Sequence, residues 1–87
     1  MQIYFKKTFA KQYKKLNNVS RDKIDKALVL FEKNPRDPAL KNHALSGKLV
    51  GKRSISAGFD LRIVFETKTD YIIVIILAVG PHSKVYA

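Results

Sequence analysis

Three side chains that can handle a phosphate group stand at the end of this chain: His82, Lys84 and Tyr86. They follow the most apolar segment of the sequence, residues 71–79, after a Gly-Pro pair that breaks it. The other histidine, His43, also falls in a predicted loop close to a glycine. Histidine serves as a general acid or general base because its pKa of about 6.5 lies near working pH. Proton transfer is therefore the first chemistry to consider at these positions.

Arg62 is unusual because it stands in the middle of a predicted strand, where an apolar or short polar residue is expected. Asp60 projects to the same face as Arg62 if the strand has begun there, since side chains alternate along a strand. One reading is a solvated surface ion pair worth less than about 1 kcal/mol. The other is an arginine that clamps phosphate beside a carboxylate that orients groups or transfers a proton. A basic stretch just upstream contains Lys48, Lys52 and Arg53.

Taken together, these residue types suit metal-free cleavage of RNA. Such cleavage needs a base to deprotonate the ribose 2′-OH and a cation to stabilise charge on the phosphorane. It also needs an acid to protonate the departing 5′-oxygen. Histidine as base or acid and arginine as the cation would fill these roles without a metal ion.

Other functional classes lack their sequence signatures. The chain has no cysteine, which excludes disulfides and thiolate metal sites, and its two histidines form no standard zinc motif. The patterns GxxxxGKS/T, GxGxxG and GxSxG, which mark nucleotide-binding and esterase sites, are absent. We therefore expect an enzyme that uses no cofactor and no metal.

The charge balance predicts a polyanionic partner. Seventeen lysines and arginines against seven acidic residues give a formal charge of +10 and a pI near 10.0. Binding of a nucleic acid would release its counterions, and an acidic protein partner fits the same charge. The longest apolar run is far shorter than the roughly 20 residues of a membrane span, and the start does not resemble a signal peptide. The absence of cysteine fits a reducing cytoplasm.

Hydrophobic periodicity predicts one domain over residues 1–87. Residues 2–6 alternate as a strand, and a helix begins at Thr8 and ends near residues 17–18. Ser20 is predicted to cap a second helix that ends at residues 34–35, where Asn-Pro disfavours helix. Strands are predicted at residues 53–57, 61–67 and 71–79, with a short helical turn within residues 39–44 and a short edge strand at residues 85–86.

This order predicts the α+β class: a strand, an antiparallel helix hairpin, then a three- to four-strand antiparallel meander. Both helices are expected to cover one face of a mainly antiparallel sheet. The opposite face has no predicted second layer, so it is where we expect the site.

Three segments resemble the RelE/ParE toxin superfamily, and within it the YafQ-like branch of type II toxin–antitoxin modules. They are HALSGKLVGKRSI at residues 43–55, DLRIVF at residues 60–65 and VGPHSKVY at residues 79–86. The resemblance implies a RelE-like fold and a ribosome-dependent endoribonuclease, an mRNA interferase. Its expected partners are mRNA, the ribosome with its 16S rRNA, and a cognate antitoxin. Operator DNA would be bound only through the antitoxin complex, and no membrane is involved.

The resemblance extends to individual positions. His43 corresponds to the histidine that precedes the L-x-G motif of YafQ-like proteins, and Asp60 corresponds to their catalytic aspartate. His82 corresponds to the histidine of their GTHS segment, with Pro81 in place of the threonine.

Two further positions match and one departs. Tyr86 falls where the family keeps a C-terminal aromatic residue, and Arg62 matches the mid-strand arginine of RelE-like members. YafQ-like toxins usually carry another histidine where Ser56 stands here. The division of labour among the remaining groups therefore stays open, and basic residues could take over part of the charge stabilisation.

The resemblance implies a role for each of these residues. We expect His82 to be the general acid, with His43 and Asp60 as base or orienting groups. Arg62 would stabilise the phosphorane, and Tyr86 would stack on or orient the substrate. The expected RNA-binding residues are Lys48, Lys52, Arg53 and Lys84.

Two alternatives stay open. A ParE-like toxin has the same fold and inhibits DNA gyrase without cleaving RNA, although such a binding toxin has no need of proton-transfer groups. A degenerate toxin that only binds its antitoxin and operator DNA is the other, because of the histidine missing at position 56.

Overall fold

The computed structural model describes residues 1–86 and confirms the α+β class. The elements follow in the order β1 (Gln2–Phe5), α1 (Lys7–Lys14), α2 (Asn18–Lys33), the 3-10 turn η1 (Pro38–Leu40), β2 (His43–Ala44), the 3-10 turn η2 (Gly47–Leu49), β3 (Arg53–Ala57), β4 (Leu61–Lys68), β5 (Ile73–Pro81) and α3 (His82–Val85). No helix among the described residues is long and apolar enough to cross a membrane.

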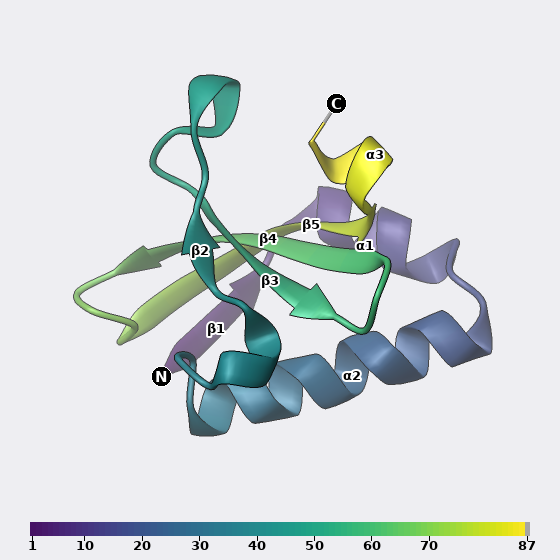
Figure 1. Cartoon of the computed structure of the whole chain (residues 1–87), viewed down its shortest axis with the longest axis horizontal. Helices are drawn as coiled ribbons and strands as arrows, with labels where there is room; N and C mark the ends of the chain where they lie inside the picture. Colours follow the sequence, from purple (N-terminus) through teal and green to yellow (C-terminus); the bar gives the residue numbers. More distant parts are fainter. Residues whose placement is uncertain (87) are drawn as a thin grey trace.

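The five strands form one sheet in the order β1-β5-β4-β3-β2. Strands β2 to β5 are antiparallel neighbours, so the predicted meander is confirmed, and β1 adds to β5 in parallel. The chain between β1 and β5 contains both long helices and strands β2 to β4, so it is long enough for the crossover that parallel pairing requires. Strands β1 and β2 are the sheet edges, and β4 lies in the middle (Figure 1).

The main core lies between the sheet and the first two helices. Alternate residues of β3 to β5 point to this side, and the buried ones include Ile55, Ile63 and Phe65. Phe9 of α1 and Phe31 of α2 pack in the same cluster. The amphipathic spacing that predicted these helices is therefore the pattern that buries them.

The opposite face of the sheet is not bare, and the prediction of an uncovered face is wrong at one end. Helix α3 packs on β4 and β5 from the side opposite α2 (Figure 1). On this face of the sheet, Val64 of β4 is 2% exposed and Ser54 of β3 is fully buried. The candidate site residues at this end of the sheet therefore lie beside α3 instead of on an open sheet.

The predicted edge strand at residues 85–86 is also wrong, because Val85 belongs to α3 and Tyr86 follows it. The outer edge of β5 is already occupied, by β1 as far as Ile76 and then by Gln12, whose Oε1 accepts from the Val79 amide at 2.9 Å. The last residues consequently turn over the sheet and do not extend it.

Two local predictions are corrected by the capping geometry. Helix α2 is capped by Asn17, whose side chain accepts from the Ser20 amide, so Ser20 lies inside the first turn. The helical turn predicted within residues 39–44 is limited to η1, which Lys41 ends in the left-handed region at φ 50°. The chain then extends into β2 because its backbone pairs with β3.

The Asn17 cap should be measurable in the stability of the domain. Asn17→Ala is expected to lower the free energy of unfolding by about 1 kcal/mol, because an amide at the start of α2 loses its acceptor. Ser20→Ala is the matched control and should change it by less than about 0.5 kcal/mol, since alanine suits a helix interior. Urea unfolding of both variants measures this; a larger loss for Ser20→Ala would contradict the assigned cap.

Candidate functional site

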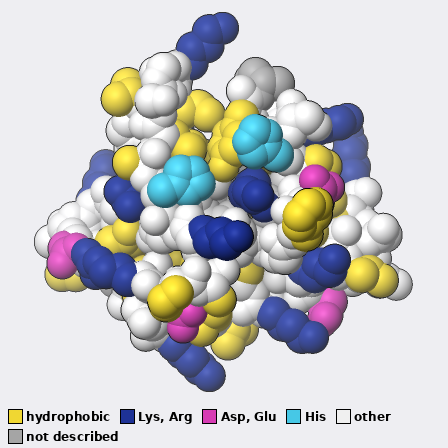
Figure 2. Space-filling model, in the orientation of Figure 1, with side chains coloured by type: hydrophobic (Ala, Val, Ile, Leu, Met, Phe, Trp, Pro, Cys, Tyr) yellow, Lys and Arg dark blue, Asp and Glu magenta, His cyan; other side chains and the backbone are white. Residues whose placement is uncertain are grey.

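Both histidines of the chain line one pocket of about 420 Å³. The pocket lies between the segment that contains β2 and η2 on one side and, on the other, His82 at the start of α3 and Tyr86 just after its end. Figure 2 shows the two histidines on one face, with lysine and arginine side chains beside them. The lining residues are His43, Ala44, Leu45, Ser46, Lys48, Leu49, His82 and Tyr86. The structure thus brings together residues 43–49 and residues 82–86, two stretches that are far apart in the sequence.

His43 is held in one tautomer by its own loop. Its Nδ1 lies 2.8 Å from the carbonyl oxygen of Lys41, and a carbonyl can only accept a hydrogen bond. Nδ1 is therefore the protonated nitrogen of the neutral ring, which leaves Nε2 with a free lone pair. The imidazole is exposed, so Nε2 can take a proton from a bound group.

His82 is positioned by the aromatic residue that follows it. The ring of Tyr86 meets the His82 ring edge-on, with the centroids 4.5 Å apart and an interplanar angle of 89°. The Tyr86 hydroxyl donates to Oγ of Ser54, a buried residue of β3 that pairs with His43. A single contact therefore ties the His82 turn to the strand beside His43.

Arg62 and Asp60 stand outside this pocket. Arg62 pairs with Ser56 on β3 and with Gly80 on β5, just before α3 begins. Its Nη1 donates to the carbonyl oxygens of Phe59 at 3.2 Å and of Leu61 at 2.9 Å, so the guanidinium turns toward the β3–β4 turn.

Asp60 lies in that turn, because β4 begins one residue later at Leu61. Its side chain is exposed and takes part in none of the ion pairs within residues 1–86. The surface ion pair with Arg62, one of the two readings of the sequence, is therefore not formed.

The predicted basic residues are divided among different surfaces. Lys48 lines the histidine pocket, whereas Lys52 faces Glu66 with Nζ 3.7 Å from Oε1. Arg53 lines a separate pocket, because it points to the other side of β3 from Ser54. Lys84 lies on the far side of α3, facing residues of α1. The basic stretch thus does not act as one patch.

Within residues 1–86, two ionisable side chains have clearly shifted pKa values, and neither lines the histidine pocket. The hydroxyl of Tyr13 donates to Asp25 at 2.6 Å, and this hydrogen bond raises the pKa of Tyr13. The hydrogen bond to Asp70, 2.8 Å long, raises the pKa of Arg36. The first links α1 to α2, and the second belongs to the pocket that contains Arg53.

Sequence reasoning missed Ser54 and the carbonyl of Lys41. A signal for Ser54 was available, because Ser54 and Ser56 alternate with apolar Ile55 and so mark a polar side of β3. No sequence signal marks the Lys41 carbonyl, since its position depends on the left-handed backbone at that residue.

Solved structures show which fold this is. The crystal structure of YafQ from Escherichia coli strain BL21(DE3) superposes with a TM-score of 0.83 at 17% identity, over 99% of this chain and 98% of that one. The Escherichia coli DinJ–YafQ toxin–antitoxin complex gives a TM-score of 0.76 at 16% identity, over 99% and 97%. The solution structure of a conserved hypothetical protein from Helicobacter pylori gives 0.73 at 28% identity, over 98% of each chain. The fold is therefore that of the YafQ and RelE-like toxins.

The particular family follows from the sequence itself. Residues 1–87 match the family model described as bacterial toxin of type II toxin–antitoxin system, YafQ, so the chain belongs to the YafQ family of toxins. No curated protein sequence matches the chain in a direct comparison.

The contact between Tyr86 and Ser54 can be tested by a double-mutant cycle. Tyr86→Phe and Ser54→Ala are each expected to lower the free energy of unfolding by about 1–2 kcal/mol, because each leaves a partner without its hydrogen bond. The double variant should lose about 1 kcal/mol less than the sum, since both changes remove the same contact. Urea unfolding measures the cycle, and strictly additive losses would contradict it.

Proposed function

We propose that this YafQ-family toxin is a ribosome-dependent endoribonuclease that cleaves mRNA in the cytoplasm by metal-free attack of the ribose 2′-OH. The observation that carries the proposal is the pocket that holds both histidines of the chain beside Lys48 and Tyr86. Two imidazoles that line the same pocket suit RNA cleavage, because one group must accept the 2′-OH proton while another donates a proton to the leaving oxygen.

The proposed reaction begins at His43. Its Nε2 accepts the 2′-OH proton, and the 2′-oxygen attacks the adjacent phosphorus. The bond from phosphorus to the 5′-oxygen then breaks, and His82 donates a proton to the departing 5′-oxygen. The products are a 2′,3′-cyclic phosphate, which water can open to a 3′-phosphate, and a free 5′-OH.

The remaining residues would bind and orient the RNA. Arg62 would stabilise the phosphorane once its guanidinium leaves the carbonyls of its own turn, which are weaker partners than a dianionic phosphorane. Asp60, in the same turn, would orient the substrate from outside the pocket. Tyr86 would hold His82 through its ring and present its other side to a base. The proposed phosphate contacts are Lys48, Lys52, Arg53 and Lys84.

We also propose that a cognate antitoxin silences this toxin. The support is the YafQ family itself and the fold shared with YafQ in the DinJ–YafQ complex. With a formal charge of +10, the chain favours an antitoxin segment rich in carboxylates. Operator DNA would be bound through that complex.

Replacement of His82 tests the proposed general acid. His82→Ala should abolish growth arrest on expression, because protonation of the leaving oxygen contributes about 100- to 10,000-fold to such a reaction. The variant should still fold and still bind the antitoxin. Lys14→Gln, on the exposed side of α1, is the control and should keep full toxicity. Full toxicity of a folded His82→Ala protein would refute the assignment.

Mapping of RNA ends separates an interferase from a gyrase inhibitor. Primer extension on mRNA from arrested cells should show cuts at codon positions, and purified toxin should cleave mRNA only when ribosomes are present. The expected products carry a 2′,3′-cyclic phosphate or a 3′-phosphate, as 2′-OH attack requires. Intact mRNA together with DNA damage would instead identify a ParE-like toxin.

A further inference from the structure

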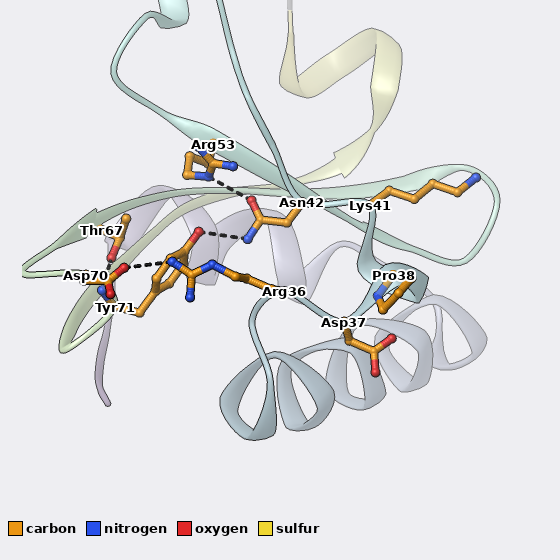
Figure 3. A pocket seen from close by; sticks show the side chains of 9 residues that line it. All are labelled: Arg36, Asp37, Pro38, Lys41, Asn42, Arg53, Thr67, Asp70 and Tyr71. Atoms are coloured by element: carbon orange, nitrogen blue, oxygen red, sulfur yellow. Dashed lines mark hydrogen bonds and ion pairs between the residues drawn. The ribbon is translucent and has the colours of Figure 1, made fainter.

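A second pocket, of about 540 Å³, lies on the other side of β3 from the histidines. It is bounded by the segment after α2, by β3 and by the β4–β5 turn. The polar side chains that define it are Arg36, Lys41, Asn42, Arg53, Asp70 and Tyr71. Figure 3 shows Asn42 linked to Arg53 and to Tyr71, and Arg36 linked to Asp70 beside them, whereas the Lys41 side chain extends away.

Asn42 holds this cluster together, because its side-chain amide makes hydrogen bonds to three other residues. Its Nδ2 donates to the carbonyl of Pro35 at 2.9 Å and to the hydroxyl of Tyr71 at 3.0 Å. Its Oδ1 accepts from Nε of Arg53 at 2.9 Å. Arg53 is thereby fixed through Nε alone. Its two terminal nitrogens make no hydrogen bond to any of residues 1–86.

The carboxylates at this pocket do not neutralise Arg53. Asp37 accepts from the Ala39 amide at 2.9 Å, and Asp70 pairs with Arg36 at 2.8 Å. Neither forms an ion pair with Arg53 or Lys41. A half-buried guanidinium with a free two-nitrogen edge is a geometry that binds phosphate or carboxylate through two parallel hydrogen bonds.

The turn at the rim is held in an unfavourable backbone conformation. Three consecutive residues have positive φ values: Thr69 at 55°, Asp70 at 50° and Tyr71 at 71°. Each costs about 1–2 kcal/mol for an L-residue that is not glycine. The turn sets Asp70 against Arg36 and sets the Tyr71 ring under the Arg36 guanidinium, 4.9 Å from its carbon. Strain of this kind is concentrated at sites that clamp a ligand.

We propose that this pocket binds one nucleotide of single-stranded RNA, with its phosphate on Arg53 and its base on the outer face of the Arg36 guanidinium. The inference rests on the proposed action on RNA. Arginine planes stack on unpaired bases, and the Arg36 side chain is 65% exposed above Tyr71. The volume also favours a nucleotide, since a carboxylate side chain would fill only a small part of about 540 Å³.

The site is joined to the histidine pocket by three consecutive residues. Asn42 holds Arg53, Lys41 lines the nucleotide pocket, and the Lys41 carbonyl holds Nδ1 of His43. A strand of RNA that passes around the edge strand β2 would therefore contact Arg53 on one side and His43 on the other. Occupation of the second pocket would steady the loop that sets the tautomer of His43.

Binding of a non-cleavable RNA tests the proposal. The probe is a fluorescein-labelled hexanucleotide in which every 2′-OH is methylated, titrated by anisotropy at several salt concentrations. Arg53→Gln should weaken binding about tenfold, because it removes a charged two-point contact. The slope of log affinity against log salt should fall by about 0.7, the value for one phosphate contact on a single strand.

Lys14→Gln is the matched control, because it removes the same charge from α1 and lies outside both pockets. It should change the RNA affinity and the salt slope less than Arg53→Gln does. Equal effects of the two variants would overturn the proposal, since the charge alone would then explain the binding. A Glu-rich peptide whose affinity depends on Arg53 when that of the RNA does not would also overturn it, in favour of a protein ligand.

A second variant keeps the test independent of the fold around Arg53. Arg36→Gln combined with Asp70→Asn removes the surface pair and the stacking plane without changing the net charge. This double variant should bind the RNA more weakly, while the slope of log affinity against log salt should stay unchanged. Wild-type affinity would count against the proposed base contact.

The binding assay and the toxicity assay can also fail separately. If His82→Ala stays toxic while Arg53→Gln loses affinity, the catalytic assignment fails and the nucleotide site stands. If His82→Ala is inactive while Arg53→Gln binds like Lys14→Gln, only the nucleotide site fails.

Discussion

The aromatic contact among Phe31, Phe65 and Tyr71 is the one on which the rest of the structure depends. Phe31 and Phe65 are fully buried, with ring centroids 4.9 Å apart, and Tyr71 meets Phe31 at 6.0 Å. These contacts fix α2 on β4 and fix the β4–β5 turn on both. Because the Tyr71 hydroxyl then binds Asn42, the core also determines where the segment leading to His43 can lie.

The two histidines of the candidate site are therefore held from two sides of the sheet. On the helix-covered side, Asn42 and the carbonyl of Lys41 set the position and tautomer of His43. On the other side, the hydroxyl of Tyr86 binds Ser54 and so places the turn that contains His82. A very small domain can position two exposed imidazoles in this way, since each depends on a rigid strand and not on its own short segment.

The sequence was informative where a feature depends on neighbouring residues. Strands β1, β3 and β4, the helix boundary at Asn-Pro and the face of each helix follow from local periodicity and are confirmed. Strand β5 is shifted by two residues from the predicted 71–79, to Ile73–Pro81. Ser20 was wrong as a cap because Asn17 competes for the same turn, and capping is decided by backbone angles. Val85 was wrong as an edge strand because the edge of β5 was already taken, which only the strand order reveals.

The sequence by itself determined the α+β class, the order of the elements, the basic charge and the residue types of the candidate site. Only the tertiary structure decided that His43 and His82 share a pocket with Lys48, whereas Arg53 belongs to another and Asp60 to neither. The physical reason is that a strand sends successive side chains to opposite faces, and that pairing brings together segments far apart in the chain. Arg53 and Ser54 are adjacent in the sequence and therefore point to opposite faces of β3. Ser54 and Tyr86 are far apart in the sequence, but the fold brings them into hydrogen-bond contact.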